Sequence, residues 1–340
     1  MQDKTADQAQ MLFNRLQKRF RHLKKWAQRT GVGAFRLYDR DIPEIPLVLD
    51  FYGNTADIND AALTCALYKR PYEKDEDDEN KWLSAMKESV SSSLGIALDN
   101  IFVKQREKQR GLSQYEKIAR AHSEKIINEY DLKFKINLSD YLDTGLFTDR
   151  RLLRAIIRSE SNEKKVLNLF CYTGVFSIYA AAGGAVSTDS VDLSNTYLNW
   201  AKENFSINNI PLEGKHNLIR SDVSDYINKA VKAKMKWDII VADPPAFSNS
   251  KKMTDNFDLN RDLTDLLIKC LAALEENGKI FTSINLRRGA PSARELEEEL
   301  RRKLNLTDLQ VIDLDNKIID EDFKGRKIPK AFLIRRQIFP

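Results

Sequence analysis

Cysteine, histidine, glycine and proline are all scarce in this 340-residue sequence. Its three cysteines and three histidines are widely scattered, so we expect neither a disulfide framework nor a metal site. With 13 glycines and 9 prolines, the chain is not of a collagen-like or low-complexity type. No apolar run reaches the length of a membrane span, and the polar start MQDKTADQAQ is unlike a signal peptide. We therefore expect a cytoplasmic globular protein that does not enter a membrane.

Two halves of the chain differ in pattern. Hydrophobic residues make up 42% of the sequence, which is enough to form the cores of two ordinary domains. Residues 11–30 carry apolar side chains at helical spacing, with basic residues on the other face. Strand patterns follow at 35–39, 46–53 and 101–107, and a helical pattern at 81–94. We expect residues 1–135 to form a small α+β domain.

The second half alternates regularly between apolar strands and helices. The expected strands are 165–170, 186–193, 237–243 and 279–285, with helices at 194–208 and 259–274 and a pair of edge strands at 309–314 and 331–336. Ser194 is the expected N-cap of the helix that it precedes. Such alternation is typical of a parallel sheet covered by helices on both faces. We expect residues 136–340 to form a doubly wound, Rossmann-like α/β domain whose ligand binds at the carboxyl ends of the strands.

Basic residues are concentrated near the start of the chain, although the net charge is only +5. Nine Lys or Arg lie between Arg15 and Arg40 against one acid, Asp39, and a second basic stretch covers 104–117. This pattern suits a nucleic-acid partner, although a solvated helix face is the alternative. The candidate phosphate contacts are Arg15, Lys18, Arg21, Lys24, Lys25, Lys104, Arg106 and Arg110.

The turn after the first strand of the second half argues against a phosphate-bearing cofactor. It reads VLNLFCYTGVFS and contains one glycine, Gly174, where a dinucleotide fold has G-x-G-x-x-G. A nucleoside cofactor without phosphates remains, and S-adenosylmethionine (SAM) is the commonest. Asp192, at the end of the second strand, would then accept the ribose hydroxyls, or else stabilise a helix N-terminus. Asp222 would accept from the adenine amino group, or else cap the following helix.

The third strand region ends in IRSDVSDY (219–226), so the strand at 237–243 is the fourth and the strand at 279–285 is the fifth. The fourth strand ends in DPPAFSNSKK. Its two prolines enforce a rigid loop at the mouth of the expected site. An acid, two prolines and an aromatic residue at this place are typical of methyltransferases that act on a planar nitrogen or a nucleobase. Asp243 begins this loop, and Phe247 is expected to stack on a base. Asn249 and Lys251 are candidate nucleotide contacts, with a plain solvated loop as the alternative.

Four stretches resemble one family. They are DYLDTGLFTDRRLLR (140–154), VLNLFCYTGVFS (166–177), STDSVDLSNTYLNWAKEN (187–204) and DPPAFSNSKKM (243–253). They are similar to the 23S rRNA guanine-N7 methyltransferases of the RlmK type, which also form one half of the bifunctional RlmKL protein, and more distantly to the RlmI type. The opening residues 13–50 resemble the same family, whereas the guanine-N2 half of the fused protein is not expected within this sequence. The resemblance implies a class I SAM-dependent methyltransferase domain preceded by a small RNA-facing domain.

The resemblance also implies roles for individual residues. The cofactor-binding set is Phe147, Asp149, Arg150, Asn168, Gly174, Asp192, Leu193, Ser194, Asp222 and Asp243. The catalytic set is Asp243, Pro244 and Phe247. The expected partner is 23S rRNA or a precursor of the large subunit. One departure is Cys171, where the family more often has serine, and we interpret this thiol as a packing residue.

Guanine N7 and cytosine C5 are the two target atoms in these related enzymes, and they require different residues. Cytosine-C5 methylation needs a cysteine thiolate, yet the loops after the fourth and fifth strands contain no cysteine. Cys270 lies at helical spacing among apolar residues and is expected in the core. Guanine N7 already has a lone pair in its plane and needs only alignment. The sequence therefore favours guanine N7; the alternatives are the cytosine-C5 enzyme, a non-catalytic assembly factor and, more distantly, an NAD-dependent oxidoreductase.

Overall fold

A computed structural model describes residues 4–55, 57–68, 75–106, 123–248, 256–286 and 289–336. The chain divides into two compact units, residues 1–144 and 145–340. Each unit has its own sheet and its own buried core. Arg110, Asn249 and Lys251 lie outside the described residues.

The first unit is a four-stranded sheet with two helices on one face. It contains α1 (Lys4–Thr30), β1 (Ala34–Asp39), β2 (Leu47–Tyr52), β3 (Ala62–Tyr68), α2 (Glu76–Leu94) and β4 (Ile101–Arg106), followed by the hairpin β5 (Glu124–Glu129) and β6 (Leu132–Asn137). The strand order is β1-β2-β3-β4, and only β3 and β4 are parallel because α2 joins them as a crossover. Short 3-10 turns occupy Ile58–Asp60 and Leu98–Asn100.

Alternation along the strands decides which face α1 and α2 cover. Phe35, Phe51 and Cys65 belong to the same buried cluster as Leu16 of α1 and Met86 of α2. Phe35 and Phe51 stack with ring centroids 4.8 Å apart. The expected helix at 11–30 and the four expected elements of this half are all present. The strand β3 and the hairpin were not predicted.

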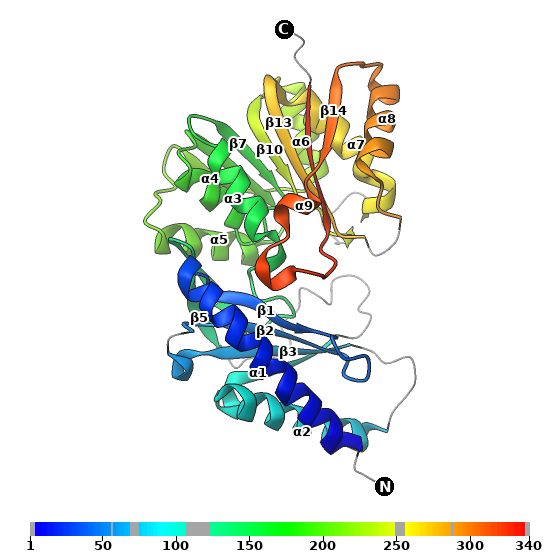
Figure 1. The fold of residues 1–340 in the computed structure, drawn as a ribbon. Helices are drawn as coiled ribbons and strands as arrows, with labels where there is room; N and C mark the ends of the chain where they lie inside the picture. The colour runs from blue at the N-terminus through cyan, green and yellow to red at the C-terminus, as the bar shows by residue number, and fades with distance from the viewer. Residues whose placement is uncertain are drawn as a thin grey trace. The chain divides into compact units, whose positions relative to one another are not determined.

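The second unit is a seven-stranded sheet with helices on both faces (Figure 1). Its elements are α3 (Arg151–Glu160), β7 (Lys165–Leu169), α4 (Val175–Ala182), β8 (Ser187–Asp192), α5 (Asn195–Ile207), β9 (His216–Arg220), α6 (Val223–Lys232), β10 (Trp237–Ala242), β11 (Phe247–Ser248), β12 (Phe257–Asp258), α7 (Leu259–Ala272), β13 (Leu274–Ile284), α8 (Ala293–Leu304), β14 (Leu309–Asp313), α9 (Asp315–Ile318) and β15 (Lys330–Arg336). Two 3-10 turns, Thr148–Arg150 and Glu321–Phe323, complete it.

The sheet order is β14-β15-β13-β10-β7-β8-β9. The five strands from β13 to β9 are parallel, while β15 is antiparallel to both β13 and β14. The expected doubly wound fold and its pair of C-terminal edge strands are confirmed. Strand order reverses between β7 and β10, so the carboxyl ends of these two strands form the switch point at which such sheets bind ligands.

Side chains on β7 show how the two faces differ. Leu167 and Leu169 pack into the core shared with α6, α7 and α8, whereas Val166 packs into the core shared with α3, α4 and α9. This alternation directs Asn168 toward α4, where its Nδ2 donates to Ser177 Oγ at 2.9 Å. Two apolar cores of this kind hold the sheet in place beneath the switch point.

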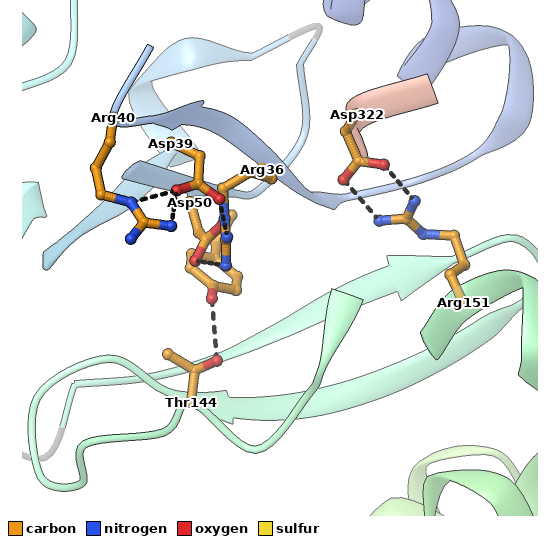
Figure 2. A network of polar contacts seen from close by, with 8 residues as sticks. Arg36, Asp39, Arg40, Asp50, Thr144, Arg151 and Asp322 are labelled. Carbon is orange, nitrogen blue, oxygen red and sulfur yellow. Dashed lines mark hydrogen bonds and ion pairs between the residues drawn. The ribbon is translucent and has the colours of Figure 1, made fainter. Parts of the chain in front are cut away.

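Figure 2 shows two ion-pair clusters, one from each unit. In the first unit, Arg36 pairs with Asp39 at 3.0 Å and also with Asp50, and Asp39 pairs with Arg40. In the second, Arg151 at the start of α3 is fully buried and pairs with Asp322 at 3.1 Å and Asp320 at 2.7 Å. Arg151 thus fixes α3 to the turn at Glu321–Phe323.

The buried pair of Arg151 and Asp322 gives a stability prediction. Asp322→Ala leaves the guanidinium with less compensation in a dry environment and should lower the free energy of unfolding by about 3–5 kcal/mol. Lys324→Ala, in the same segment, removes an exposed pair with Glu321 and should cost less than about 1 kcal/mol. Urea unfolding of both variants measures the difference, and equal losses would contradict the prediction.

Candidate active site

The loop between β7 and α4, residues 170–174, lies at the switch point. Phe170, Tyr172 and Gly174 have φ angles of 56°, 51° and 76°, in the left-handed region. Two non-glycine residues in this region need external support. The support includes the Asp192 carboxylate, because Oδ2 accepts the N–H of Tyr172 at 3.0 Å and Oδ1 accepts the N–H of Ser194 at 2.9 Å. One carboxylate therefore joins the loops that follow β7 and β8.

Burial changes the acidity of the groups in these loops. Loss of water around Asp192 raises its pKa to about 6, although the N–H groups of Ser194, Tyr172 and Leu193 favour its charged form. Burial, followed by the negative charge of Asp192, raises the pKa of the Cys171 thiol well above its ordinary value. Cys171 therefore remains a neutral thiol at physiological pH.

Two glycines permit close approaches around this loop. A Cβ on Gly174 would lie 2.8 Å from the Cβ of Ala201, so the glycine lets α5 pack closely against the loop. A Cβ on Gly145, whose φ is 95°, would lie 2.2 Å from the Trp200 ring. The Gly145 carbonyl accepts a hydrogen bond from the Thr173 hydroxyl at 2.6 Å. These contacts bring the segment that begins at Gly145 against residues 170–174.

A charged cluster connects this segment to the loop after β10. Asp243 follows β10 directly, and its Oδ1 accepts hydrogen bonds from Arg150 Nη2 at 3.3 Å and from the Ser283 hydroxyl. Arg150 Nη1 lies 3.1 Å from Asp149 Oδ2. Burial lowers the pKa of Arg150, but the charges of Asp243 and Asp149 outweigh it and raise the pKa overall. Arg150 therefore stays charged.

A pocket opens among these groups. Its lining consists of Gly145, Phe147, Arg150, Arg154, Phe170, Cys171, Tyr172, Thr173, Val175, Phe176 and Asp243. Aromatic rings form one wall, since Tyr172 lies 5.4 Å from Phe147 and 4.4 Å from Tyr197 between ring centroids. The Arg154 guanidinium donates to the Phe147 carbonyl at 2.8 Å and so fixes the backbone beside this wall. The pocket thus combines aromatic surface with buried charges of both signs.

Comparisons with known proteins identify the family. A family model described as S-adenosylmethionine-dependent methyltransferase matches residues 48–322. The chain is 40% identical over 324 residues to "Ribosomal RNA large subunit methyltransferase K" of Neisseria meningitidis, covering 95% of this chain and 86% of that protein. The chain belongs to this methyltransferase family.

Two further comparisons agree with this assignment. The sequence is 40% identical over 319 residues to "Ribosomal RNA large subunit methyltransferase K/L" of Shewanella sediminis, covering 94% of this chain but only 42% of that longer protein. The fold is similar to that of SMU.776, a proposed methyltransferase crystallised with SAH. Their TM-score is 0.72 at 23% identity, over 96% of this chain and 81% of the other. The cofactor of the family is SAM, as the sequence predicted.

Unpaired polar atoms of the pocket decide its fit to SAM. Arg150 Nε and Nη1 are buried and donate no hydrogen bond within the described residues, and Asp149 Oδ1 is buried and accepts none. Buried donors and acceptors without partners are costly unless a ligand satisfies them. The methionine end of SAM carries a carboxylate and an ammonium group, which match the guanidinium donors and the carboxylate acceptor. The residues present therefore fit the cofactor.

Some of the residues predicted to bind SAM lie at the pocket loops, and others are buried or cap helices. Phe147, Arg150, Gly174, Asp192 and Asp243 lie in or beside the loops described above, while Asn168 is fully buried in a polar contact with Ser177. Ser194 and Asp222 each have a local partner. Ser194 caps α5, as predicted, and Asp222 caps α6 by accepting the Asp225 N–H at 3.0 Å, which is the alternative left open for it. Leu193, between Asp192 and Ser194, is half-buried.

The loop after β10 carries the expected catalytic residues. Pro244 and Pro245 follow Asp243, and Phe247 lies in β11, paired with Asp258 of β12. The Phe247 side chain is 41% exposed, so its ring is available for stacking. Cys171 and Cys270 are buried, in agreement with their interpretation as packing residues.

The residues expected to contact phosphates differ in exposure and in their ion-pair partners. On α1, Lys18, Arg21 and Lys25 are exposed and Lys24 is half-buried, while Arg15 pairs with Asp41 at 2.6 Å. The prediction for Lys104 is wrong, because its side chain is buried and its ammonium group donates to the carbonyls of Tyr141 and Leu142 at 2.7 and 3.2 Å. The Arg106 side chain lies outside the described part of the chain, although β4 includes its backbone.

Sequence reasoning missed Gly145, Tyr172, Arg154 and Ser283. Gly145 was present in the DTGLFTDRR segment, but its contact with Trp200 spans more than fifty residues. Ser283 lies beside Asp243 because the preceding residues, Thr282 and Ala242, are register partners in adjacent parallel strands. Such a contact needs the strand register as well as the sequence.

Within the described residues, the structure contains neither a metal-binding cluster nor a membrane-spanning helix. Among those residues, no group of three or more His, Cys, Asp or Glu is placed to hold a metal ion. None of their helices combines the length and apolar character required to cross a bilayer.

The close approach at Gly145 gives a prediction with a matched control. Gly145→Ala adds a methyl group against Trp200 as well as left-handed strain, and should displace the pocket segment and weaken SAM binding. Gly95→Ala has a similar φ of 72° but meets nothing within 4 Å. We expect Gly95→Ala to cost about 1 kcal/mol of unfolding free energy and Gly145→Ala about 1–3 kcal/mol more. Urea unfolding and calorimetric titration with SAM measure both, and equal SAM affinity in the two variants would overturn the argument.

Proposed function

We propose that this protein transfers a methyl group from SAM to N7 of a guanine in large-subunit rRNA. The relatives named as large-subunit rRNA methyltransferases support the RNA substrate. One observation about the pocket favours guanine N7 over cytosine C5. Cys171, which lines the pocket together with Asp243, is buried and has a raised pKa, so it is not a thiolate nucleophile. With an rRNA substrate, the protein would act in the cytoplasm.

Guanine N7 needs neither a covalent nucleophile nor a general base, since its lone pair lies in the plane of the ring. SAM supplies an electrophilic methyl group on a sulfonium. The protein's contribution is then to align the base and to stabilise the positive charge that develops on it. Methylation proceeds by direct in-line transfer without a covalent enzyme intermediate.

Asp243 is the residue suited to that charge. Ser283 and Arg150 both donate to its Oδ1, and within the described residues Oδ2 accepts no hydrogen bond. One oxygen is thus anchored while the other is available to the base. Pro244 restricts the backbone beside it, and the exposed ring of Phe247 stacks on the target.

The target guanine must leave its helix to reach this site. N7 lies on the major-groove edge, and that groove in A-form RNA is too deep and narrow for side chains to enter. The base is therefore methylated when unpaired or flipped out. This requirement agrees with an aromatic side chain at the mouth, because stacking replaces the neighbours that an unstacked base loses.

The proposed function is tested by nucleoside analysis. Wild-type protein with SAM should generate 7-methylguanosine in large-subunit rRNA, detected by mass spectrometry of the digested nucleosides. Asp243→Asn keeps the shape of the side chain but removes its charge, and should lower kcat by roughly 10²–10³-fold. Formation of 5-methylcytidine instead would replace the proposal by the cytosine-C5 reaction, and SAM binding without any methylation would favour a non-catalytic factor.

The raised pKa of Asp192 gives a pH prediction. We propose that its carboxylate accepts the ribose hydroxyls of SAM, so protonation removes an acceptor. Because its pKa is about 6, the SAM dissociation constant should rise as pH falls through this value, by about tenfold at pH 5 relative to neutral pH. Calorimetric titrations across this range measure it. Asp192→Asn should bind weakly with no such pH dependence, and an unchanged dependence in that variant would exclude Asp192 as the titrating group.

A further inference from the structure

Helix α1 in the first unit carries a line of exposed basic residues on one side. Its members, which we call the basic stripe, are Lys18, Arg21, Lys25 and Arg29. They follow one another at intervals of three, four and four residues, which places them on a single face of the helix. From Gln8 to Thr30 the helix contains no acidic residue.

The basic stripe lies opposite the face that α1 buries. Leu12, Leu16 and Leu23 are fully buried against the sheet and α2, and Trp26 is almost so. At 100° per residue, these positions centre on the side of the helix facing away from the stripe. Packing of the domain therefore holds the stripe toward solvent along its whole length.

The members of the basic stripe differ from Arg15 and Arg36 of the same unit, which both have counter-ions. Arg15 pairs with Asp41, and Arg36 pairs with Asp39 and Asp50. No member of the basic stripe forms an ion pair within the described residues. Four positive charges in line without neutralisation repel one another, so a binding partner that supplies negative charge is stabilised there.

The length of the stripe matches a nucleic-acid backbone. Lys18 to Arg29 covers about 16 Å of helix axis at 1.5 Å per residue. One strand of duplex DNA presents a phosphate about every 3.4 Å along its axis. At a spacing of this order, about five phosphates of one strand fall within the length of the stripe. We infer that the basic stripe of α1 is a docking surface for the sugar–phosphate backbone of the RNA substrate. The inference rests on the proposed RNA substrate.

The test measures RNA binding without methyl transfer. Fluorescence anisotropy of a labelled RNA hairpin of mixed sequence, recorded over a series of salt concentrations, gives the slope of log K against log salt. Arg21→Gln/Lys25→Gln should weaken binding and reduce that slope by about 1 for each cation removed. Both residues are exposed, and circular dichroism with thermal unfolding checks that the variant folds like the wild type.

A control double variant separates the stripe from general charge. Arg294→Gln/Lys324→Gln removes the same net charge from exposed residues that pair with Glu298 and Glu321, and should leave the slope unchanged. Equal slopes in the stripe and control double variants would overturn the inference.

Other outcomes are also decisive. Absence of RNA binding by the wild type would likewise overturn the stripe as an RNA surface. So would a stripe variant that binds RNA like the wild type but no longer binds vesicles containing phosphatidylserine. Nucleoside analysis decides the proposed function separately. Methylated rRNA together with an unaltered salt slope would therefore overturn the basic stripe while retaining guanine methylation.

Discussion

The start of α3 places two consecutive buried arginines against carboxylates from distant segments of the chain. Arg150 meets Asp243 after β10, and Arg151 meets Asp320 and Asp322 near the C-terminus. A buried guanidinium is strongly destabilising unless its charge is compensated. The segment from Gly145 to α3 can therefore take only a position that satisfies both arginines at once. That position brings Phe147 and Arg150 to the edge of the sheet where β7 and β10 end, and so the pocket depends on it.

The same constraint explains how structural and chemical roles are shared at the site. The Nη1 and Nη2 groups of Arg151 donate to Asp320 and Asp322 inside the fold, and these bonds hold α3 in place. Arg150 is only partly satisfied, since within the described residues its Nε donates no hydrogen bond and its Nη1 meets Asp149 only as an ion pair. Because its neighbour already fixes the backbone, Arg150 can keep unsatisfied donors for a ligand. Ser283 plays a comparable part for Asp243, because it anchors Oδ1 and leaves Oδ2 available to the target base.

Much of the second unit could be predicted because its signals are local. Ser194 and Asp222 cap helices within three residues, and the buried strands read as continuous apolar runs. Contacts between residues far apart in the sequence leave no such local pattern. Lys104 stands in a basic stretch, yet it occupies a strand position whose side chain turns inward to two carbonyls. The burial of Lys104 depends on the alternation of side chains along its strand and on the loop at Tyr141, which follows 37 residues later.

The backbone hydrogen bonds of the β7–α4 loop explain why a nucleoside cofactor suits this fold better than a dinucleotide. A diphosphate is held by backbone N–H groups that a glycine-rich turn leaves unpaired. Here the Cys171 N–H donates to Val191, that of Tyr172 to Asp192, and that of Gly174 to Cys171. The side chains of Phe170 and Tyr172 occupy positions that glycines would leave open. With three of its N–H donors consumed and its space filled by rings, the loop offers aromatic contact and a carboxylate. These suit a base and a sugar, whereas the carboxylate repels a phosphate.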